Sequence, residues 1–251
     1  MVLGVTVDFP YQPYPCQIAM LGKIIKALQQ SKNCLLESPT GTGKTLTLLC
    51  ASLAWQQKEL EQARQAVLEE IKEAKESVTK PKPISRIFYC TRTHKQLEQV
   101  AKQLQNTTYK DKIQMTLLSS RDNYCIHPVV SKASNKNHEC AKLTRPDPNN
   151  QGKGKWEMSK SACGFYERLR GKTSNDFTRS SGAKQAPHVF DIEQFTEYCQ
   201  STHAVCPYYT SRLLIVDANI ILCPYNYLID PRVRNSMQLS VSNSIVIIDE
   251  G

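Results

Sequence analysis

The stretch from Glu37 to Thr45 reads Glu-Ser-Pro-Thr-Gly-Thr-Gly-Lys-Thr. It follows a short apolar run at positions 34–36, which predicts a buried strand, and it precedes apolar residues at helical spacing over positions 46–55. A glycine-rich turn between a strand and a helix is typical of a loop that binds phosphates, because backbone N–H groups converge there at the positive end of the helix dipole. The sequence therefore predicts a nucleoside triphosphate site, against the alternative of an ordinary turn before a helix.

Each part of this loop has an expected role. Lys44 is expected to reach the β- and γ-phosphates, and the Thr45 hydroxyl is expected to ligate Mg²⁺. Ser38 stands where the common pattern G-x-x-x-x-G-K-[ST] has its first glycine, which is a departure from that pattern. The residues expected to contact the nucleotide are Ser38, Pro39, Thr40, Gly41, Thr42, Gly43, Lys44 and Thr45.

A second chemical signal is the pair Asp249 and Glu250, which follows the apolar run Ser244 to Ile248. At the end of a strand in a nucleotide-hydrolysing fold, such an aspartate holds Mg²⁺ and the glutamate orients or deprotonates the attacking water. By itself the pair could equally be an ordinary strand end. Together with Lys44 and Thr45 it predicts a catalytic set of Lys44, Asp249 and Glu250, with Thr45 and Asp249 as the Mg²⁺ ligands.

The remaining pattern alternates strands and helices joined by short turns. Such alternation predicts an α/β fold with a parallel sheet that is covered by helices on both faces. Positions 121–186 show little periodicity and are expected to be largely irregular, as an insertion into this fold. The expected helices lie at 16–30, 46–77, 94–105, 192–198 and 207–216, the expected strands at 34–36, 86–90, 113–118, 218–223 and 244–248, and the run 80–83 is expected to end the second helix.

The composition of the chain limits the classes of protein to which it can belong. The chain has 251 residues, a formal net charge of +9 and a hydrophobic share of 40%. No run approaches the roughly 18 apolar residues that span a bilayer, and the first residues lack the basic region of a secretion signal. Positions 121–186 hold 13 Lys and Arg against 6 Asp and Glu, which is +7. This excess suits a polyanion such as nucleic acid, with a solvated loop region as the alternative.

The ten cysteines divide into two groups. Because no export signal is visible, metal ligation and simple burial are better explanations for them than disulfides. Five fall among apolar neighbours and are expected in the core, namely Cys16, Cys34, Cys50, Cys90 and Cys223. Four others, Cys125, Cys140, Cys163 and Cys206, lie in or beside the basic stretch without any C-x-x-C pair. Their spacing leaves structural thiols, an iron–sulfur cluster and zinc open, with Cys199 as a fifth candidate ligand.

Several motifs resemble those of the XPD-like iron–sulfur DNA helicases of superfamily 2, along essentially the whole chain. Phe9-Pro10-Tyr11 with Tyr14 and Gln17 is similar to the adenine-recognition motif of that family, which implies that Tyr14 and Gln17 contact the base. The stretch 37–45 resembles its motif I, including the serine. The run Thr91 to Gln96 resembles motif Ia, which implies that Arg92, Thr93 and His94 contact the DNA backbone. Within the family the sequences of these motifs are most similar to those of the Fanconi anaemia group J helicases, with telomere-length-regulating helicases as near relatives.

The same resemblance bears on the cysteines. The sequences around Cys125, Cys140, Cys163 and Cys206 are similar to the approaches to the four cluster ligands of the family. The resemblance therefore implies a 4Fe-4S cluster on these residues and a RecA-like first motor domain interrupted by the cluster insertion. It divides the chain into residues 1–120 as the first part of the motor domain, 121–206 as the insertion, and 207–251 as the return to the motor domain.

The resemblance also implies a function, which is that of an ATP-dependent 5′→3′ DNA helicase of genome maintenance. ATP, Mg²⁺ and the cluster would be its cofactors, single-stranded or forked DNA and unspecified repair proteins its partners, and the nucleus its location, with no membrane partner. The family continues its motif II as Asp-Glu-Ala-His, whereas this chain reads Asp249-Glu250-Gly251, so it is expected to be the amino-terminal portion and to be inactive alone. The alternatives are a non-catalytic DNA- or partner-binding module and an unrelated phosphate-loop ATPase or kinase.

Overall fold

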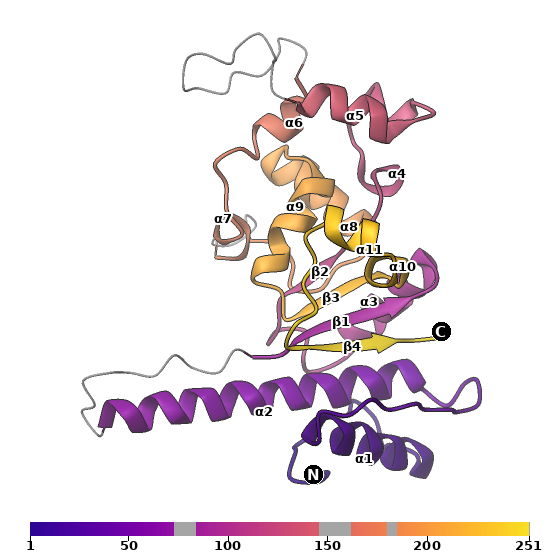
Figure 1. The fold of residues 1–251 in the computed structure, drawn as a ribbon, viewed down its shortest axis with the longest axis vertical. Coiled ribbons are helices and arrows are strands. Elements are labelled where there is room, and N and C mark those ends of the chain that lie inside the picture. The colour runs from indigo at the N-terminus through magenta and orange to yellow at the C-terminus, as the bar shows by residue number, and fades with distance from the viewer. Residues whose placement is uncertain (73–83, 146–161, 180–184, 251) are drawn as a thin grey trace. The chain divides into compact units, whose positions relative to one another are not determined.

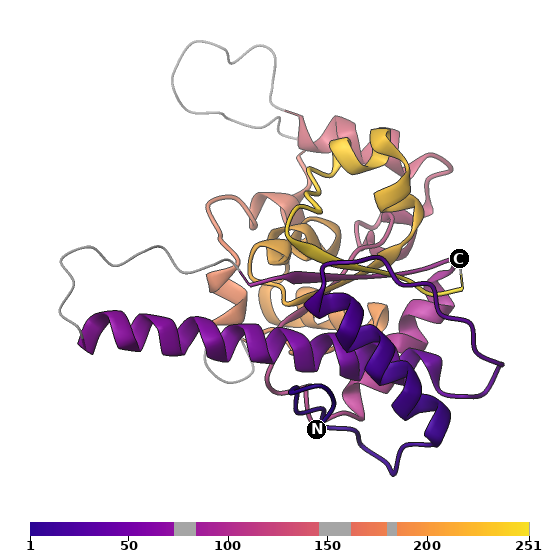
Figure 2. The same cartoon turned by 60° about the horizontal axis from the view of Figure 1, so that its bottom comes forward.

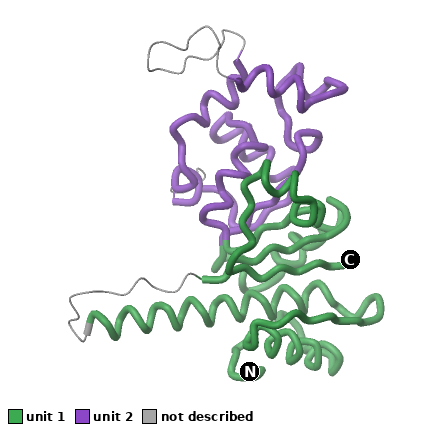
Figure 3. Tube along the Cα trace, viewed as in Figure 1, with its two compact units in different colours: residues 1–113, 219–251 green, residues 114–218 purple. Residues whose placement is uncertain are grey.

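The protein is described here from a computed structural model, which covers residues 1–72, 84–145, 162–179 and 185–250. The chain divides into two compact units (Figure 3). The first unit comprises residues 1–113 and 219–251, and the second comprises residues 114–218. The expected insertion, residues 121–206, lies within the second unit. Its separate identity as a cluster domain stays a prediction.

A parallel sheet forms the centre of the first unit. Its strands are β1 (Arg86–Thr91), β3 (Ile220–Pro224) and β4 (Ser244–Ile248). They lie in the order β3-β1-β4, and β1 pairs in parallel with both neighbours (Figure 1). Every residue of β3, and every residue of β1 after Arg86, is buried, as continuous apolar strands of a covered parallel sheet should be. The predicted parallel α/β architecture is confirmed.

Helices cover this sheet because each presents an apolar face. In α3 (His94–Gln105) the side chains of Leu97, Val100, Ala101 and Leu104 are buried, at the spacing of one helical face. This helix contacts β1 and β3, whereas α1 (Pro15–Gln29) packs on α2 (Lys44–Lys72), as Figures 1 and 2 both show. The unit also contains two short helices, α10 (Asn226–Ile229) and α11 (Pro231–Ser236), which the sequence analysis did not predict.

The strand predicted at residues 34–36 is wrong. These residues are irregular, and the Leu35 side chain is 99% exposed. An apolar run of three residues is too short for its periodicity to identify a strand, and a strand also needs a neighbour with which to pair. Among the described residues, β4 is the edge strand of the sheet, and its Val246 and Ile248 side chains are 43% and 49% exposed. Residues 34–36 therefore enter the phosphate loop without a pairing strand.

Two of the five cysteines predicted in the core are also placed differently. Cys50, Cys90 and Cys223 are fully buried, as predicted, whereas Cys16 and Cys34 are exposed. Cys34 is exposed because its segment does not join the sheet. Cys16 lies in the first turn of α1, before the first apolar residue that this helix buries, Met20. The remainder of the expected polar helix beyond residue 72 and its end at residues 80–83 lie outside the described residues.

The second unit is built from short helices around an aromatic core. Phe190 and Phe195 stack with ring centroids 4.3 Å apart, and Tyr124 meets Phe195 edge-on at 5.9 Å. The prediction of a largely irregular stretch is wrong for the described parts of 121–186, which contain several one- and two-turn helices. The elements of this unit are β2 (Met115–Leu117), α4 (Arg121–Tyr124), α5 (Lys136–Thr144), α6 (Gly164–Glu167), α7 (Asn175–Thr178), α8 (Ile192–Tyr198), α9 (Pro207–Leu213) and 3₁₀ turns at Val130–Lys132 and Leu214–Val216.

Candidate functional site

The predicted phosphate loop lies directly before α2, the long helix that begins at Lys44. Gly41 and Gly43 have φ values of +80° and +74°, a region that side chains disfavour, so the turn depends on glycine at both positions. The Lys44 ammonium donates a hydrogen bond to the backbone oxygen of Ser38 at 2.8 Å. The Ser38 hydroxyl is 2.6 Å from that of Thr42. The loop is thus curled around the lysine head, with Ser38 taking part in place of the missing first glycine.

The predicted adenine-contacting glutamine braces this loop. The Gln17 amide nitrogen donates to the backbone oxygen of Thr42 at 3.0 Å, and its amide oxygen accepts from the backbone N–H of Tyr14 at 2.9 Å. A Cβ atom at Gly43 would lie 2.5 Å from the same amide nitrogen, so any other residue there would displace the Gln17 side chain from the loop. The Tyr14 side chain is 66% exposed. Contact between these two residues and the adenine base stays a prediction, and the structure adds a role for Gln17 in holding the phosphate loop.

The two predicted Mg²⁺ ligands meet, although they are 204 positions apart in the chain. The Thr45 hydroxyl donates to Oδ2 of Asp249 at 3.0 Å. Asp249 is held in place because its backbone N–H donates to the backbone oxygen of Cys90 at 2.8 Å, continuing the sheet beyond β4. A hydroxyl and a carboxylate are hard oxygen donors of the kind that Mg²⁺ binds through one or two protein groups and substrate phosphates. The residues present therefore fit Mg²⁺ together with a nucleotide.

A buried tyrosine completes this group. The Tyr89 hydroxyl of β1 donates to the same Oδ2 of Asp249 at 2.7 Å. Burial raises the pKa of Tyr89 well above its usual value, and the neighbouring Asp249 carboxylate acts in the same direction, so the hydroxyl remains a donor at neutral pH. The sequence analysis missed this residue. A tyrosine inside an apolar strand has no local signal that separates it from other core aromatics.

Glu250, the predicted general base, contacts the segment predicted to bind DNA. The Gln96 amide of α3 donates a hydrogen bond to the Glu250 carboxylate. Gln96 also accepts from the backbone N–H of Thr93, forming a capping box at the start of α3. The Thr-x-x-Gln spacing signals the cap in the sequence, whereas the contact with Glu250 had no sequence signal. Of the predicted backbone-contacting residues, Arg92 and Thr93 are exposed and His94 is half-buried.

Burial lowers the pKa of His94 below its usual value, although the Glu98 carboxylate acts in the opposite direction. The unfolded chain then takes up a proton at a higher pH than the folded chain. The neutral ring makes its full contribution to the free energy of unfolding above about pH 6.5, the pKa of histidine in the unfolded chain. This contribution is lost as the pH falls below that value. We expect the urea concentration at the unfolding midpoint to decrease when the pH is lowered from about 7.5 to about 5.5. The decrease should be smaller in His94→Gln. An identical pH dependence in the wild type and His94→Gln would contradict the effect.

The four predicted cluster cysteines line one cavity in the second unit. Cys125 follows α4, Cys140 lies within α5, and Cys163 and Cys206 immediately precede α6 and α9. Two backbone hydrogen bonds bring their segments together. The N–H of Cys163 donates to the oxygen of Leu143 at 3.2 Å, and that of Cys206 donates to the oxygen of Phe165 at 3.1 Å. Cys199, the fifth candidate, is buried but is not among the residues that line this cavity.

Burial favours the neutral form of two of these thiols. Burial raises the pKa of Cys206 to about 12 and also raises that of Cys125. Among the residues that the structure describes, no group of three or more His, Cys, Asp or Glu is arranged around a single metal ion. Four cysteines around one cavity match the number of protein ligands that an iron–sulfur cluster takes.

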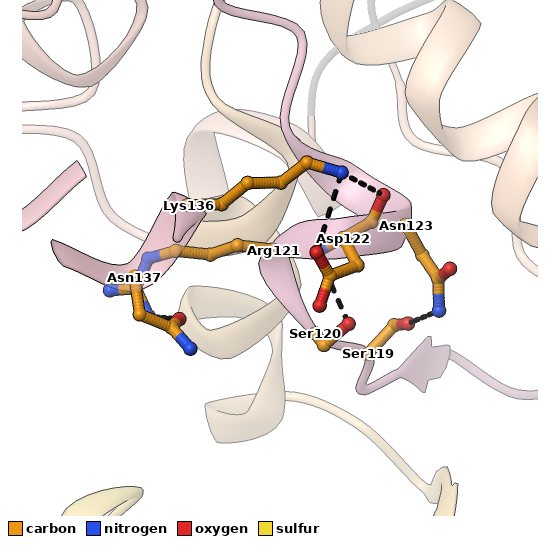
Figure 4. Close-up of polar contacts among 7 residues, drawn as sticks. All are labelled: Ser119, Ser120, Arg121, Asp122, Asn123, Lys136 and Asn137. Atoms are coloured by element: carbon orange, nitrogen blue, oxygen red, sulfur yellow. Dashed lines mark hydrogen bonds and ion pairs between the residues drawn. The ribbon is translucent and has the colours of Figure 1, made fainter. Parts of the chain in front are cut away.

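A network of polar contacts joins the segments around Cys125 and Cys140 (Figure 4). Arg121 of α4 donates to Oδ1 of Asn137 in α5 at 3.0 Å, and Lys136 lies 3.3 Å from the Asp122 carboxylate. The Arg121 guanidinium also donates to the hydroxyls of Tyr208 and Tyr209 at 2.9 and 3.0 Å and is a hydrogen-bond partner of the Cys140 thiol. Arg121 therefore links the elements that carry three of the four cysteines, and the sequence analysis did not single it out.

Two family models match the chain. The DEAD_2 model matches residues 89–251, and the model for the type III restriction enzyme, res subunit, matches residues 10–139. The chain belongs to the DEAD_2 helicase family. Human regulator of telomere elongation helicase 1 is 37% identical over 98% of the chain, and the Caenorhabditis elegans homologue is also 37% identical over 98% of it. These matches cover 20% and 24% of the relatives, so the chain spans about a fifth to a quarter of their length.

Solved structures of XPD share the fold of this DEAD_2 chain. An XPD helicase structure superposes with a TM-score of 0.55 at 19% identity, covering 95% of this chain and 32% of that one. A truncated XPD superposes with a TM-score of 0.51 at 19% identity, covering 92% of this chain and 51% of that one. The predicted XPD-like fold is confirmed. Within the described ranges, no helix has the length and apolar character needed to cross a bilayer.

Proposed function

We propose that this chain carries the first motor domain of an ATP-dependent 5′→3′ DNA helicase that acts in genome maintenance in the nucleus. The observation that carries this proposal is the 3.0 Å contact between the Thr45 hydroxyl and the Asp249 carboxylate. It brings the end of the phosphate loop to the end of β4, which is the arrangement that Mg²⁺-dependent phosphoryl transfer requires. Membership of the DEAD_2 family and the telomere elongation helicase relatives support the same function.

The roles of individual residues follow from this geometry. Lys44 would bind the β- and γ-phosphates, Thr45 and Asp249 would hold Mg²⁺, and Glu250 would orient the attacking water. When bound, Mg²⁺ supplies charge neutralisation on the phosphates. A non-catalytic binding module is the weaker alternative, because the lysine, hydroxyl and two carboxylates that hydrolysis needs are all present, and the hydroxyl of Thr45 meets the carboxylate of Asp249. A binding module would need none of them. A greater likeness to Fanconi anaemia group J helicases than to telomere elongation helicases stays a prediction.

We also propose that Cys125, Cys140, Cys163 and Cys206 bind a 4Fe-4S cluster. Their shared cavity and the family membership support this assignment. In such a site the chain's own contribution is to hold four thiols at fixed positions and to exclude water. Cys140, Cys163 and Cys206 are at most 9% exposed. The Arg121 network joins the segments that carry Cys125, Cys140 and Cys206. The cluster would in turn hold together short helices that share only a small aromatic core.

Single-stranded DNA is the proposed partner, and its backbone would contact Arg92, Thr93 and His94 at the start of α3. The exposure of Arg92 supports this role. The ring of Tyr208 is not free for base stacking, because the guanidinium carbons of Arg121 and Arg212 lie 3.9 and 3.4 Å from its centre. A base would have to displace these cations before it could stack there.

This interface predicts salt-sensitive, sequence-independent binding. For single strands the affinity falls with a logarithmic slope of about 0.7 per phosphate contact, so each contact predicts a loss of about 2.6-fold between about 50 and about 200 mM salt. Fluorescence anisotropy with labelled oligothymidine and mixed-sequence strands measures this slope. We expect Arg92→Gln to reduce it by about 0.7. Lys102→Gln, near the other end of α3, serves as the matched control and should leave it unchanged. Binding that ignores salt would contradict the proposed interface.

A further inference from the structure

Tyr89 is a buried polar group to which the proposed mechanism assigns no role. It lies in the middle of β1, opposite Ile247 of β4 in the sheet register, and its side chain is 0% exposed. Its hydroxyl lies 2.7 Å from Oδ2 of Asp249, 160 positions away in the chain. A buried hydroxyl bonded to a carboxylate forms a charge-assisted hydrogen bond, which is stronger than a bond between neutral groups. This bond connects strand β1 of the sheet to a proposed Mg²⁺ ligand.

The two residues that donate hydrogen bonds to Asp249 differ in their second role, because one is a proposed metal ligand and the other is a buried residue of the sheet. Thr45 and Tyr89 both donate to Oδ2, at 3.0 and 2.7 Å. The Thr45 oxygen is itself a proposed metal ligand, so its position changes with the metal. Tyr89 belongs to the central strand of the sheet and is packed on all sides, so its hydroxyl provides a fixed reference for the carboxylate. It occupies Oδ2, and no described residue donates to Oδ1, which is left for the ion.

We propose that Tyr89 is a positioning residue for Mg²⁺, holding the Asp249 carboxylate in the orientation that binds the ion. This role rests on the proposed nucleotide site and adds a residue to it. Groups that orient a metal ligand through a hydrogen bond typically change metal affinity by about 10–100-fold when they are removed. Without the hydroxyl, the carboxylate can rotate about its side-chain bonds, and each favourable orientation for Mg²⁺ is then less populated.

The test is Mg²⁺-dependent binding of ATP that carries a methylanthraniloyl fluorophore, measured on the whole 251-residue chain. Tyr89→Phe removes one oxygen atom and keeps the ring. We expect it to raise the Mg²⁺ concentration for half-maximal enhancement of nucleotide binding by about tenfold. Nucleotide affinity in the presence of EDTA should stay unchanged, because a merely structural defect would alter both. Tyr109→Phe is the matched control, since that tyrosine is also buried in the first unit and its hydroxyl accepts from the backbone of Asp8.

Each outcome decides between the alternatives. Equal Mg²⁺ dependence in the wild type and Tyr89→Phe would overturn the role of Tyr89 alone. No nucleotide binding by the wild type at any Mg²⁺ concentration would overturn the proposed function and the role of Tyr89 with it. If Tyr89→Phe unfolds, it is combined with Asp249→Asn, which removes the buried charge. Recovery of folding in the double variant would support the coupling between Tyr89 and Asp249, whereas two unfolded variants would assign Tyr89 a structural role and overturn the proposal.

Discussion

Replacing Cys163 with serine is expected to remove the iron from the protein. Purified without oxygen, the wild type should be brown and contain about four irons and about four sulfides per chain, as a cluster held by four cysteine thiolates requires. Serine removes one thiolate from the four-cysteine cavity, and a cluster with three remaining protein ligands is exposed to loss. Iron and sulfide analysis together with the visible absorption spectrum measures the change directly.

The chain offers a matched control for this experiment. Cys199 is fully buried in the same unit but does not line the cavity, so Cys199→Ser should keep its iron. Loss of the cluster should also loosen the second unit, because its short helices share only a small core. Hydrogen exchange in residues 114–145 and 185–218 should therefore be faster in Cys163→Ser than in the wild type. Stoichiometric zinc without iron or sulfide would contradict the cluster, as would iron that Cys199→Ser loses and Cys163→Ser retains.

Replacing Lys44 with alanine is expected to weaken ATP binding by at least about 100-fold. The lysine is the one cation inside the described loop, and without it the proposed charge pair with the nucleotide phosphates is lost, which leaves the phosphate charges unpaired in the site. Isothermal titration with ATP and Mg²⁺ measures this loss. Lys58→Ala, on the same helix but far from the loop, serves as the control, since its ammonium lies over the Trp55 ring and not near the phosphate site. Equal ATP affinity in Lys44→Ala and the wild type would contradict the proposed site.

Hydrolysis by these 251 residues alone should nevertheless be slow. Phosphoryl transfer needs positive charge on both sides of the transferred group, and one side would come from Lys44 and from the Mg²⁺ that Thr45 and Asp249 would hold. In many phosphate-loop enzymes an arginine supplies the other side. In other phosphate-loop enzymes such an arginine contributes about 10³–10⁵ in rate. A polypeptide of these residues should therefore turn over ATP at least about a thousandfold more slowly than a two-domain helicase of the family. DNA-stimulated turnover that Lys44→Ala abolishes would show that one motor domain is enough.

Structural elements that depend on short sequence patterns could be predicted without the structure. The phosphate loop was predictable because a short run of glycines, lysine and threonine has few other uses before an apolar helix. The helix from His94 to Gln105 was predictable because four apolar residues recur on one face behind a Thr-x-x-Gln cap. The parallel sheet followed from alternating strands and helices. These predictions succeed because short-range backbone preferences and burial of one face are enough to fix them.

Contacts between residues that are far apart in the sequence could be identified from the folded structure alone. Asp249 receives Thr45 and Tyr89 across 204 and 160 positions, and those contacts depend on the register of β1 against β4. The same dependence explains the wrong strand at residues 34–36, because a strand forms only where a neighbouring edge accepts its hydrogen bonds, and apolar composition does not supply that edge. The order of the strands and their register thus bring one oxygen of the Asp249 carboxylate within hydrogen-bond distance of both the phosphate loop and the buried tyrosine.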